Sequence, residues 1–114
     1  MEYIKTFLSI QQQIRLYHWT TKTYNQHVIT GKLYEKLDEH IDKFIEILLA
    51  NNTVDQCNVT TRTSPCTTRE DLIKILKKFV IFLNQQVDLT SDLLTIRDEI
   101  IGEVHRHLYL LKMN

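Results

Sequence analysis

Apolar residues recur every three or four positions along four stretches of this chain, which is the spacing of one face of an α-helix. Between the second and third stretches this periodicity is lost over residues 51–67, where threonine and asparagine are frequent and the only proline occurs. The pattern predicts helices over residues 3–22, 25–50, 69–88 and 90–112. Two short connections and one longer connection, between the second and third helices, predict an all-α fold. We expect an antiparallel four-helix bundle formed by residues 1–114 as a single domain.

Each predicted helix carries an apolar stripe that we expect to face the core. The stripes comprise Ile4, Phe7, Leu8, Ile14 and Tyr17; Leu33, Leu37, Ile41, Phe44, Ile45 and Leu48; Ile73, Leu76, Val80, Leu83 and Val87; and Leu93, Ile96, Ile100, Val104, Leu108 and Leu111. Thr68 is expected to cap the third helix, and Thr90 or Ser91 the fourth. Gly31 lies inside the second helix at a cost of about 1 kcal/mol relative to alanine. Its presence indicates a close approach at that point.

Composition and charge exclude several classes of protein. Fourteen Lys and Arg residues balance fourteen Asp and Glu residues. This balance argues against a nucleic-acid partner, because such binding depends mainly on phosphate neutralisation. No apolar run approaches the roughly 20 residues of a transmembrane helix, and the first residues lack the features of a signal peptide. We therefore expect no membrane partner and a protein that is cytoplasmic, not secreted.

The two cysteines do not suggest a metal site. Cys57 and Cys66 are nine positions apart in the threonine-rich loop, and this spacing matches no zinc motif. We expect free thiols, because a reducing compartment disfavours disulfides. A loop disulfide in an oxidising particle is the alternative.

The second helix carries the strongest chemical pattern. Asp42 and Glu46 are four residues apart and therefore share one face of the helix. His27 lies fifteen residues before Asp42, which corresponds to an offset of only about 60° around the helix axis. This stripe flanks the apolar face, so we expect it to meet a neighbouring subunit. Such ligands suit iron, zinc or manganese. The alternative is that the carboxylates are solvated or paired with Lys43.

These residues resemble the signature of Dps-like mini-ferritins, which belong to the ferritin-like superfamily. The shared pattern is a His-Trp pair at the end of the first helix (His18 and Trp19), a histidine early in the second (His27), and then Asp42 and Glu46. In that family one subunit supplies the histidines and its two-fold partner supplies the carboxylates. The resemblance implies a ferritin-like bundle with His18 and His27 as ligands from one subunit, Asp42 and Glu46 as ligands from the other, and Trp19 packed beside the site. It also implies that Fe²⁺ is oxidised there by peroxide or O₂.

The chain departs from this family at one ligand position. The family has an acidic ligand four residues after the second histidine, where this chain has Gly31. Glu35, one turn further along, is the candidate substitute. The chain also lacks the Lys-rich N-terminal tail with which some members bind DNA.

A second resemblance, over most of the chain, is to the small Dps-like proteins of large DNA viruses and phages. This chain shares with them the His-Trp pair, a histidine with a glycine downstream, and the segments Ile-Arg-Asp-Glu-Ile and Tyr-Leu-Leu, here residues 96–100 and 109–111. The resemblance implies a viral source, in which case the protein is located in the virion.

The fourth predicted helix offers a secondary set of ligands. Glu99, Glu103 and His107 follow one another at four-residue steps and form a stripe beside the core face. A second metal there is one interpretation. The alternative is a solvated flank with a pair between Glu103 and His107 or Arg106. Asp38, His40 and His105 are expected on the surface.

Two functions remain open from the sequence. The first is an iron-binding protein with ferroxidase activity at a dimer interface, for which the partner is a second copy of the chain. The second is a non-catalytic structural or interaction protein, such as a virion component that binds other virion proteins. Retained ligand positions favour the first function, whereas Gly31 favours the second.

Overall fold

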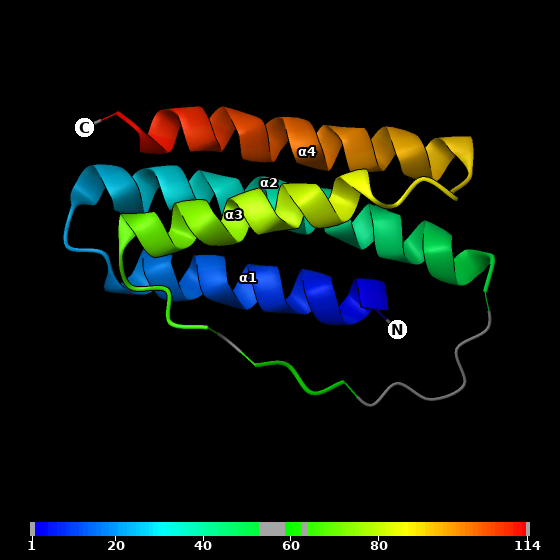
Figure 1. The fold of residues 1–114 in the computed structure, drawn as a ribbon, viewed down its shortest axis with the longest axis horizontal. Coiled ribbons are helices and arrows are strands. Elements are labelled where there is room, and N and C mark those ends of the chain that lie inside the picture. The colour runs from blue at the N-terminus through cyan, green and yellow to red at the C-terminus, as the bar shows by residue number, and fades with distance from the viewer. Residues whose placement is uncertain (1, 53–58, 63, 114) are drawn as a thin grey trace.

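Four helices pack side by side in the computed structural model, which describes residues 2–52, 59–62 and 64–113 (Figure 1). The helices are α1 (Glu2–Thr20), α2 (Tyr24–Ala50), α3 (Arg69–Asn84) and α4 (Ser91–Leu111). Both α1 and α4 pack against α2 and α3, so every neighbouring pair of helices runs antiparallel. The predicted all-α bundle is therefore confirmed.

The connection between α2 and α3 determines the order of the helices around the bundle. It spans residues 51–68 and returns the chain along the length of the bundle, so that α3 begins near the turn between α1 and α2 (Figure 1). In its described part, the Thr61 hydroxyl donates to Gln12 Oε1 at 2.9 Å. One long connection gives an up-down-down-up order, in which α1 and α4 are parallel and diagonal. The predicted longer loop is confirmed.

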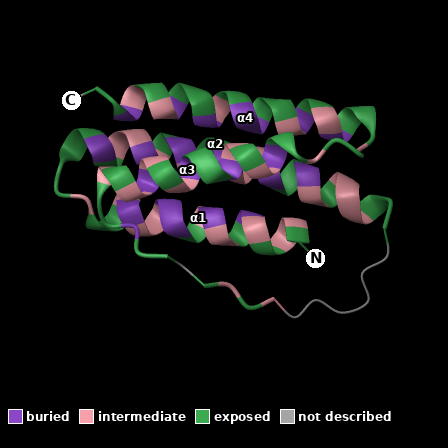
Figure 2. Ribbon diagram, in the orientation of Figure 1, coloured by how far each residue is buried: buried purple, intermediate pink, exposed green. Residues whose placement is uncertain are grey.

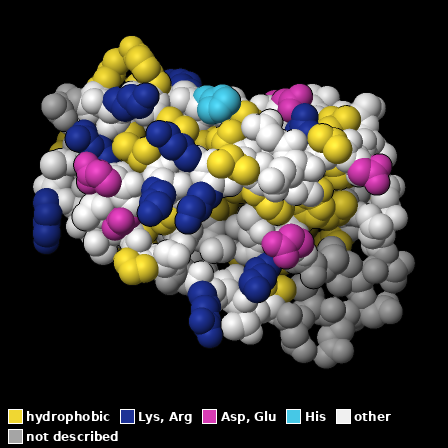
Figure 3. All heavy atoms as spheres, in the orientation of Figure 1, with side chains coloured by type: hydrophobic (Ala, Val, Ile, Leu, Met, Phe, Trp, Pro, Cys, Tyr) yellow, Lys and Arg dark blue, Asp and Glu magenta, His cyan; other side chains and the backbone are white. Residues whose placement is uncertain are grey.

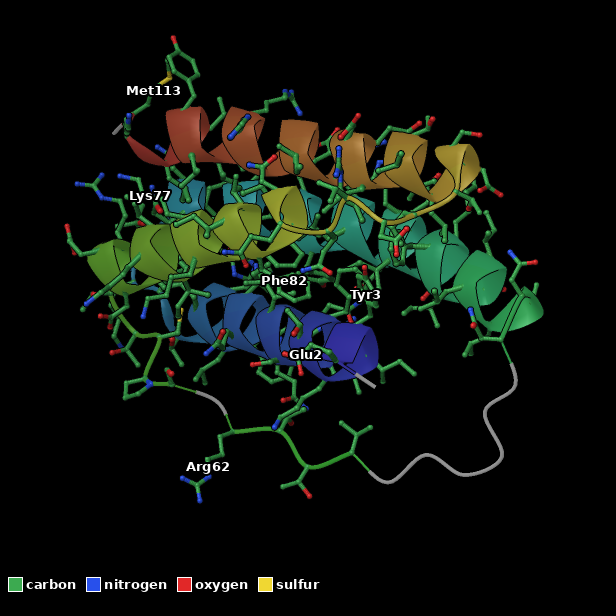
Figure 4. All side chains as sticks on the ribbon, turned by 45° about the vertical axis from the view of Figure 1, so that its right-hand side comes forward. Glu2, Tyr3, Arg62, Lys77, Phe82 and Met113 are labelled. Carbon is green, nitrogen blue, oxygen red and sulfur yellow. The ribbon has the colours of Figure 1, made fainter. Side chains whose placement is uncertain are left out.

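The core lies between the inward faces of the four helices (Figure 2). At one end, aromatic rings join three of the helices. The Phe44 ring of α2 lies 5.3 Å from the ring of Tyr3 and 5.3 Å from that of Phe7, both on α1. Phe79 and Phe82 of α3 complete the cluster, the former 5.9 Å from Phe7 and the latter 5.9 Å from Tyr3. Figure 4 shows Tyr3 and Phe82 close to each other.

The third helix is shorter than its apolar pattern predicts. It ends at Asn84, not at residue 88, and Val87 is 69% exposed. Tertiary hydrogen bonds hold the link that follows. Tyr3 Oη donates to Gln86 Oε1 at 2.9 Å, and Arg97 Nη1 donates to the Gln86 carbonyl at 2.6 Å. The apolar spacing extends beyond the helix to Val87 by coincidence. The helix itself ends at Asn84 because the chain must turn there to reach α4.

The predicted helix caps are confirmed in position. Thr68 precedes α3, and its hydroxyl accepts a hydrogen bond from the Asp71 amide at 3.1 Å. Thr90 precedes α4 without capping it through its side chain. The Asp92 carboxylate instead accepts from the Leu93 amide at 2.9 Å and from the Thr90 hydroxyl. These bonds lower the pKa of Asp92.

Cys66 is a buried thiol in the described part of the loop. It is free and has no exposed surface. Burial, with a smaller contribution from Asp71, raises its pKa to about 11. A thiol with such a pKa is not a reactive thiolate near neutral pH. The expectation of a free thiol is confirmed for Cys66, whereas Cys57 lies outside the described residues.

The surface that faces the viewer in Figure 1 is mixed in charge. Figure 3 shows basic, acidic and apolar side chains interspersed over it. Helix α3 contributes exposed Lys74, Lys77 and Lys78 together with Glu70. Its Ile81 is also 60% exposed.

Candidate metal-ligand pair

His18 and His27 form the best candidate for a functional site. His18 lies near the end of α1 and His27 in the first turn of α2, so the short link between the helices brings them together. Their rings stack with centroids 3.9 Å apart and an interplanar angle of 15°. His27 is exposed and His18 is half-buried. The structure therefore unites two residues that the sequence predicts as ligands from one subunit.

Hydrogen bonds favour one neutral tautomer of each imidazole. His27 Nδ1 lies 2.9 Å from the carbonyl oxygen of His18, which can only accept, so this nitrogen carries a proton. His18 Nδ1 lies 3.2 Å from Thr30 Oγ1. The Thr30 hydroxyl donates its single proton at 2.7 Å to the carbonyl of Gln26, so it accepts from His18. When neutral, both rings thus keep their lone pair on Nε2.

Gly31 allows His18 to approach α2 closely. A Cβ atom at position 31 would lie 3.0 Å from His18 Cε1 and 3.5 Å from its Nδ1. Even an alanine at this position would require the His18 ring to shift by a few tenths of an ångström. The close approach expected at Gly31 is therefore confirmed, and the glycine has a packing role in addition to being a departure from the mini-ferritin pattern.

Charged and aromatic side chains extend from the histidines along the contact between α1 and α2. The Tyr34 ring lies edge-on to His18, with centroids 5.2 Å apart, and the Arg15 guanidinium lies 5.1 Å from the Tyr34 centroid. Arg15 also pairs with Asp38 at 2.6 Å, and Gln11 Nε2 donates to the same carboxylate at 2.6 Å. Asp38, which was expected on the surface, is therefore half-buried between the two helices. Sequence reasoning missed this network, because it depends on the relative rotation of α1 and α2.

Asp42 and Glu46 lie further along the same contact. Together with Ile4, Leu8 and Ile45 they line a groove of about 280 Å³ between α1 and α2. Both carboxylates are exposed. Neither one forms an ion pair or hydrogen bond within the described residues, so the alternative pairing with Lys43 is not seen there. Leu8, predicted to be in the core, is 41% exposed beside them.

A single subunit does not assemble these residues into a metal centre. No group of three or more His, Cys, Asp or Glu side chains within the described residues is arranged to hold a metal ion. Fifteen residues of helix separate His27 from Asp42 by about 22 Å along the axis. Trp19, predicted to pack beside the site, is 71% exposed in the subunit, and Glu35 is exposed on α2.

The secondary set on α4 separates into two pairs. Glu99 Oε2 lies 3.2 Å from Nδ1 of His40 on α2, so these two side chains form a pair. His40 is half-buried, and the expectation that it lies on the surface was wrong. His107 is 1% exposed, and its Nδ1 donates to the Glu103 carbonyl at 2.9 Å. Glu103 Oε2, 3.7 Å from the same nitrogen, is buried without a hydrogen-bond partner among the described residues. A second metal on this stripe stays a prediction.

His107 predicts a loss of stability in acid. Burial of the ring lowers its pKa; Arg106 and Lys32 nearby act in the same direction, while Glu103 opposes them. The unfolded chain binds this proton near the ordinary value of 6.5. The neutral, buried ring of His107 therefore contributes its full stabilisation above pH 6.5, and this stabilisation is lost as the pH falls from 6.5 towards the pKa of the folded protein.

We expect the free energy of unfolding in urea to fall less between pH 7.5 and 5.5 in His107→Gln than in the wild type. His105→Gln, an exposed neighbour, is the control, and equal losses in all three proteins would contradict the prediction.

Comparison with known proteins identifies the family of the chain but not its function. The structure defines the class as an all-α four-helix bundle. The chain belongs to the Family of unknown function (DUF5856), whose model matches residues 18–111 and so includes both histidines. No curated protein and no solved structure gives a significant match. None of the four helices, as far as the structure describes them, combines the length and apolar character of a membrane span.

Proposed function

We propose that this chain is a metal-binding bundle of the Dps-like kind, in which His18 and His27 bind a divalent cation. The observation that carries this proposal is the pair of stacked imidazoles whose Nδ1 protons are both bound within the protein. Histidines that bind metals commonly donate the other ring N–H to a carbonyl or a similar acceptor. Each ring therefore keeps an Nε2 lone pair for a metal ion, and because the two rings stack nearly parallel, one of them must rotate for both to bind the same ion.

A second copy of the chain would complete the site. The histidines lie at one end of the contact between α1 and α2, and Asp42 and Glu46 line the groove further along. A two-fold axis near the midpoint of residues 27 and 42 would place the histidines of one copy beside the carboxylates of the other. It would also cover the exposed Leu8 and the apolar part of the groove. Closed two-fold dimers are the commonest symmetric oligomers.

Ferrous iron is the substrate that we propose, because the resemblance to mini-ferritins implies it and these ligand types are compatible with it. Carboxylates offset the charge of the cation, and imidazoles suit iron and zinc. With peroxide as oxidant, two Fe²⁺ ions each lose one electron, the O–O bond breaks, and two protons are taken up to give two waters. The glycine at position 31 removes one carboxylate from the family pattern, so we expect weaker binding than in a complete site. Exposed Glu35 is the candidate replacement.

The test is a titration of the purified, metal-free protein with Fe²⁺ under anaerobic conditions, followed by a pulse of O₂ or peroxide. We expect stoichiometric binding and oxidation faster than in buffer, together with a dimer or larger oligomer in sedimentation equilibrium. A monomer that binds neither iron nor zinc would overturn the proposal. The alternative function would then apply: a structural or interaction protein, such as a component of a virion.

The proposed two-fold axis predicts a specific cross-link. Residues 34 and 35 lie at the midpoint between His27 and Asp42, so they would meet their counterparts across the axis. Glu35→Cys is therefore expected to form a disulfide-linked dimer under mild oxidation, as measured by non-reducing electrophoresis. Glu39→Cys is the matched control, because position 39 is exposed on the same helix but about 6 Å further along it. Equal cross-linking of the two variants, or none, would argue against this axis.

A further inference from the structure

Thr30 stands out as a buried polar residue next to the histidine pair. Its side chain has no exposed surface, and its hydroxyl faces three polar atoms. It donates to the Gln26 carbonyl at 2.7 Å, lies 3.3 Å from the His27 carbonyl, and accepts from His18 Nδ1 at 3.2 Å. The first of these bonds uses the only hydroxyl proton. With its proton on that carbonyl, Thr30 acts towards His18 as an acceptor.

This arrangement disfavours the other neutral tautomer of His18. With the proton on Nε2, the Nδ1 lone pair would face the Thr30 oxygen lone pairs at 3.2 Å, and a contact between two acceptors is unfavourable. Gly31 adds a steric condition, because it leaves the space that the ring occupies beside α2. His27 reaches the same tautomer independently, through the backbone carbonyl of His18.

We propose that Thr30 is the positioning residue of the histidine pair, because it holds His18 in the Nδ1–H tautomer. One subunit then presents two Nε2 donors, and the site selects a cation that prefers imidazole nitrogen. Zinc and ferrous iron belong to this class, whereas Mn²⁺ and Mg²⁺ prefer carboxylate and water oxygen. This inference rests on the proposed metal-binding function and specifies which cations the site takes. It also assigns a role to Thr30, which the ligand pattern in the sequence does not include.

The first measurement concerns the metal-free protein. Long-range ¹H–¹⁵N correlation spectra distinguish the two neutral tautomers of each histidine at a pH where the rings are neutral. In the wild type we expect Nδ1–H for both His18 and His27. Thr30→Val keeps the shape of the side chain but removes the acceptor, so His18 should shift towards the Nε2–H form while His27 does not change. Thr30→Ser, which retains the hydroxyl, should behave as the wild type. Persistence of the Nδ1–H form of His18 in Thr30→Val would overturn the positioning role.

The second measurement is the affinity for Zn²⁺ and Mn²⁺, determined by competition with a chromophoric chelator. The wild type should prefer Zn²⁺, and Thr30→Val should bind it about 10–100-fold more weakly, as is typical for the loss of an outer partner of a metal-binding histidine. Thr30→Ser should bind nearly as the wild type does. Because Zn²⁺ binds more tightly than Mn²⁺ at most nitrogen and oxygen sites, the selectivity is measured by the change between variants, and an equal loss of affinity for both ions in Thr30→Val would overturn it.

Controls separate the possible failures. Thr95→Val removes a similar hydroxyl-to-backbone bond in α4, 2.9 Å to the Ser91 carbonyl, which is not part of the histidine pair. It should leave both the tautomers and the zinc affinity unchanged. If no variant binds zinc, the proposed function fails, and the spectra still decide the role of Thr30. If Thr30→Val binds zinc as tightly as Thr30→Ser does, the positioning role fails and the proposed function stands.

Discussion

Replacement of His27 or of Asp42 with alanine is expected to abolish metal binding in each variant alone, and mixing the two variants is expected to restore part of it. Both side chains are exposed, so neither change should reduce helicity. The loss of a direct ligand should weaken binding by more than the 10–100-fold typical of outer-shell partners. Calorimetric titration with Zn²⁺ or anaerobic Fe²⁺ measures the effect.

The restoration follows from a site shared between two copies. A mixed dimer of His27→Ala and Asp42→Ala contains one site with both residues intact and one that lacks both. After co-refolding of equal amounts, about half of the dimers are mixed, so about a quarter of the wild-type sites return. A mixture of His27→Ala with His18→Ala is the matched control, because every site in it lacks a histidine. Recovery in neither mixture would show that histidines and carboxylates do not share a site across the interface.

Replacement of Phe44 with alanine is expected to lower the free energy of unfolding by about 3–5 kcal/mol. Phe44 has no exposed surface, and its ring links Tyr3 and Phe7 of α1 to α2. A cavity there would also loosen the contacts through which α3 joins the cluster. Because a domain of this size is stable by only about 5–15 kcal/mol, this single change removes a large part of the total.

Urea unfolding followed by circular dichroism measures this loss. Ile81→Ala is the control, because Ile81 is 60% exposed on α3 and its replacement should change stability by less than about 0.5 kcal/mol. Similar losses in the two variants would show that the aromatic cluster is not the main contact between α1, α2 and α3. Retention of the wild-type midpoint in Phe44→Ala would lead to the same conclusion.

The apolar pattern predicted the four helices well, but it predicted less well where α3 ends and what Leu8 contacts. Leu33, Leu37, Ile41 and Phe44 are all buried as predicted, because the periodicity of a helix face is a local property of the sequence. Leu8 and Val87 fit the same periodicity and are exposed. Their exposure depends on how far each helix is rotated and where the chain must turn, and neither is encoded in the spacing of apolar residues.

The candidate site shows the same division. The sequence by itself determined the four helices, the longer connection between α2 and α3, and the positions of the histidines and carboxylates along α1 and α2. Only the tertiary structure decided that the His18 and His27 rings stack, that Gly31 makes room for one of them, and that Thr30 lies within hydrogen-bond distance of its Nδ1. The physical reason is that helix periodicity follows from neighbours three or four residues apart. Ring stacking and tautomer choice depend instead on distances between two helices, which are set by the packing of the whole bundle.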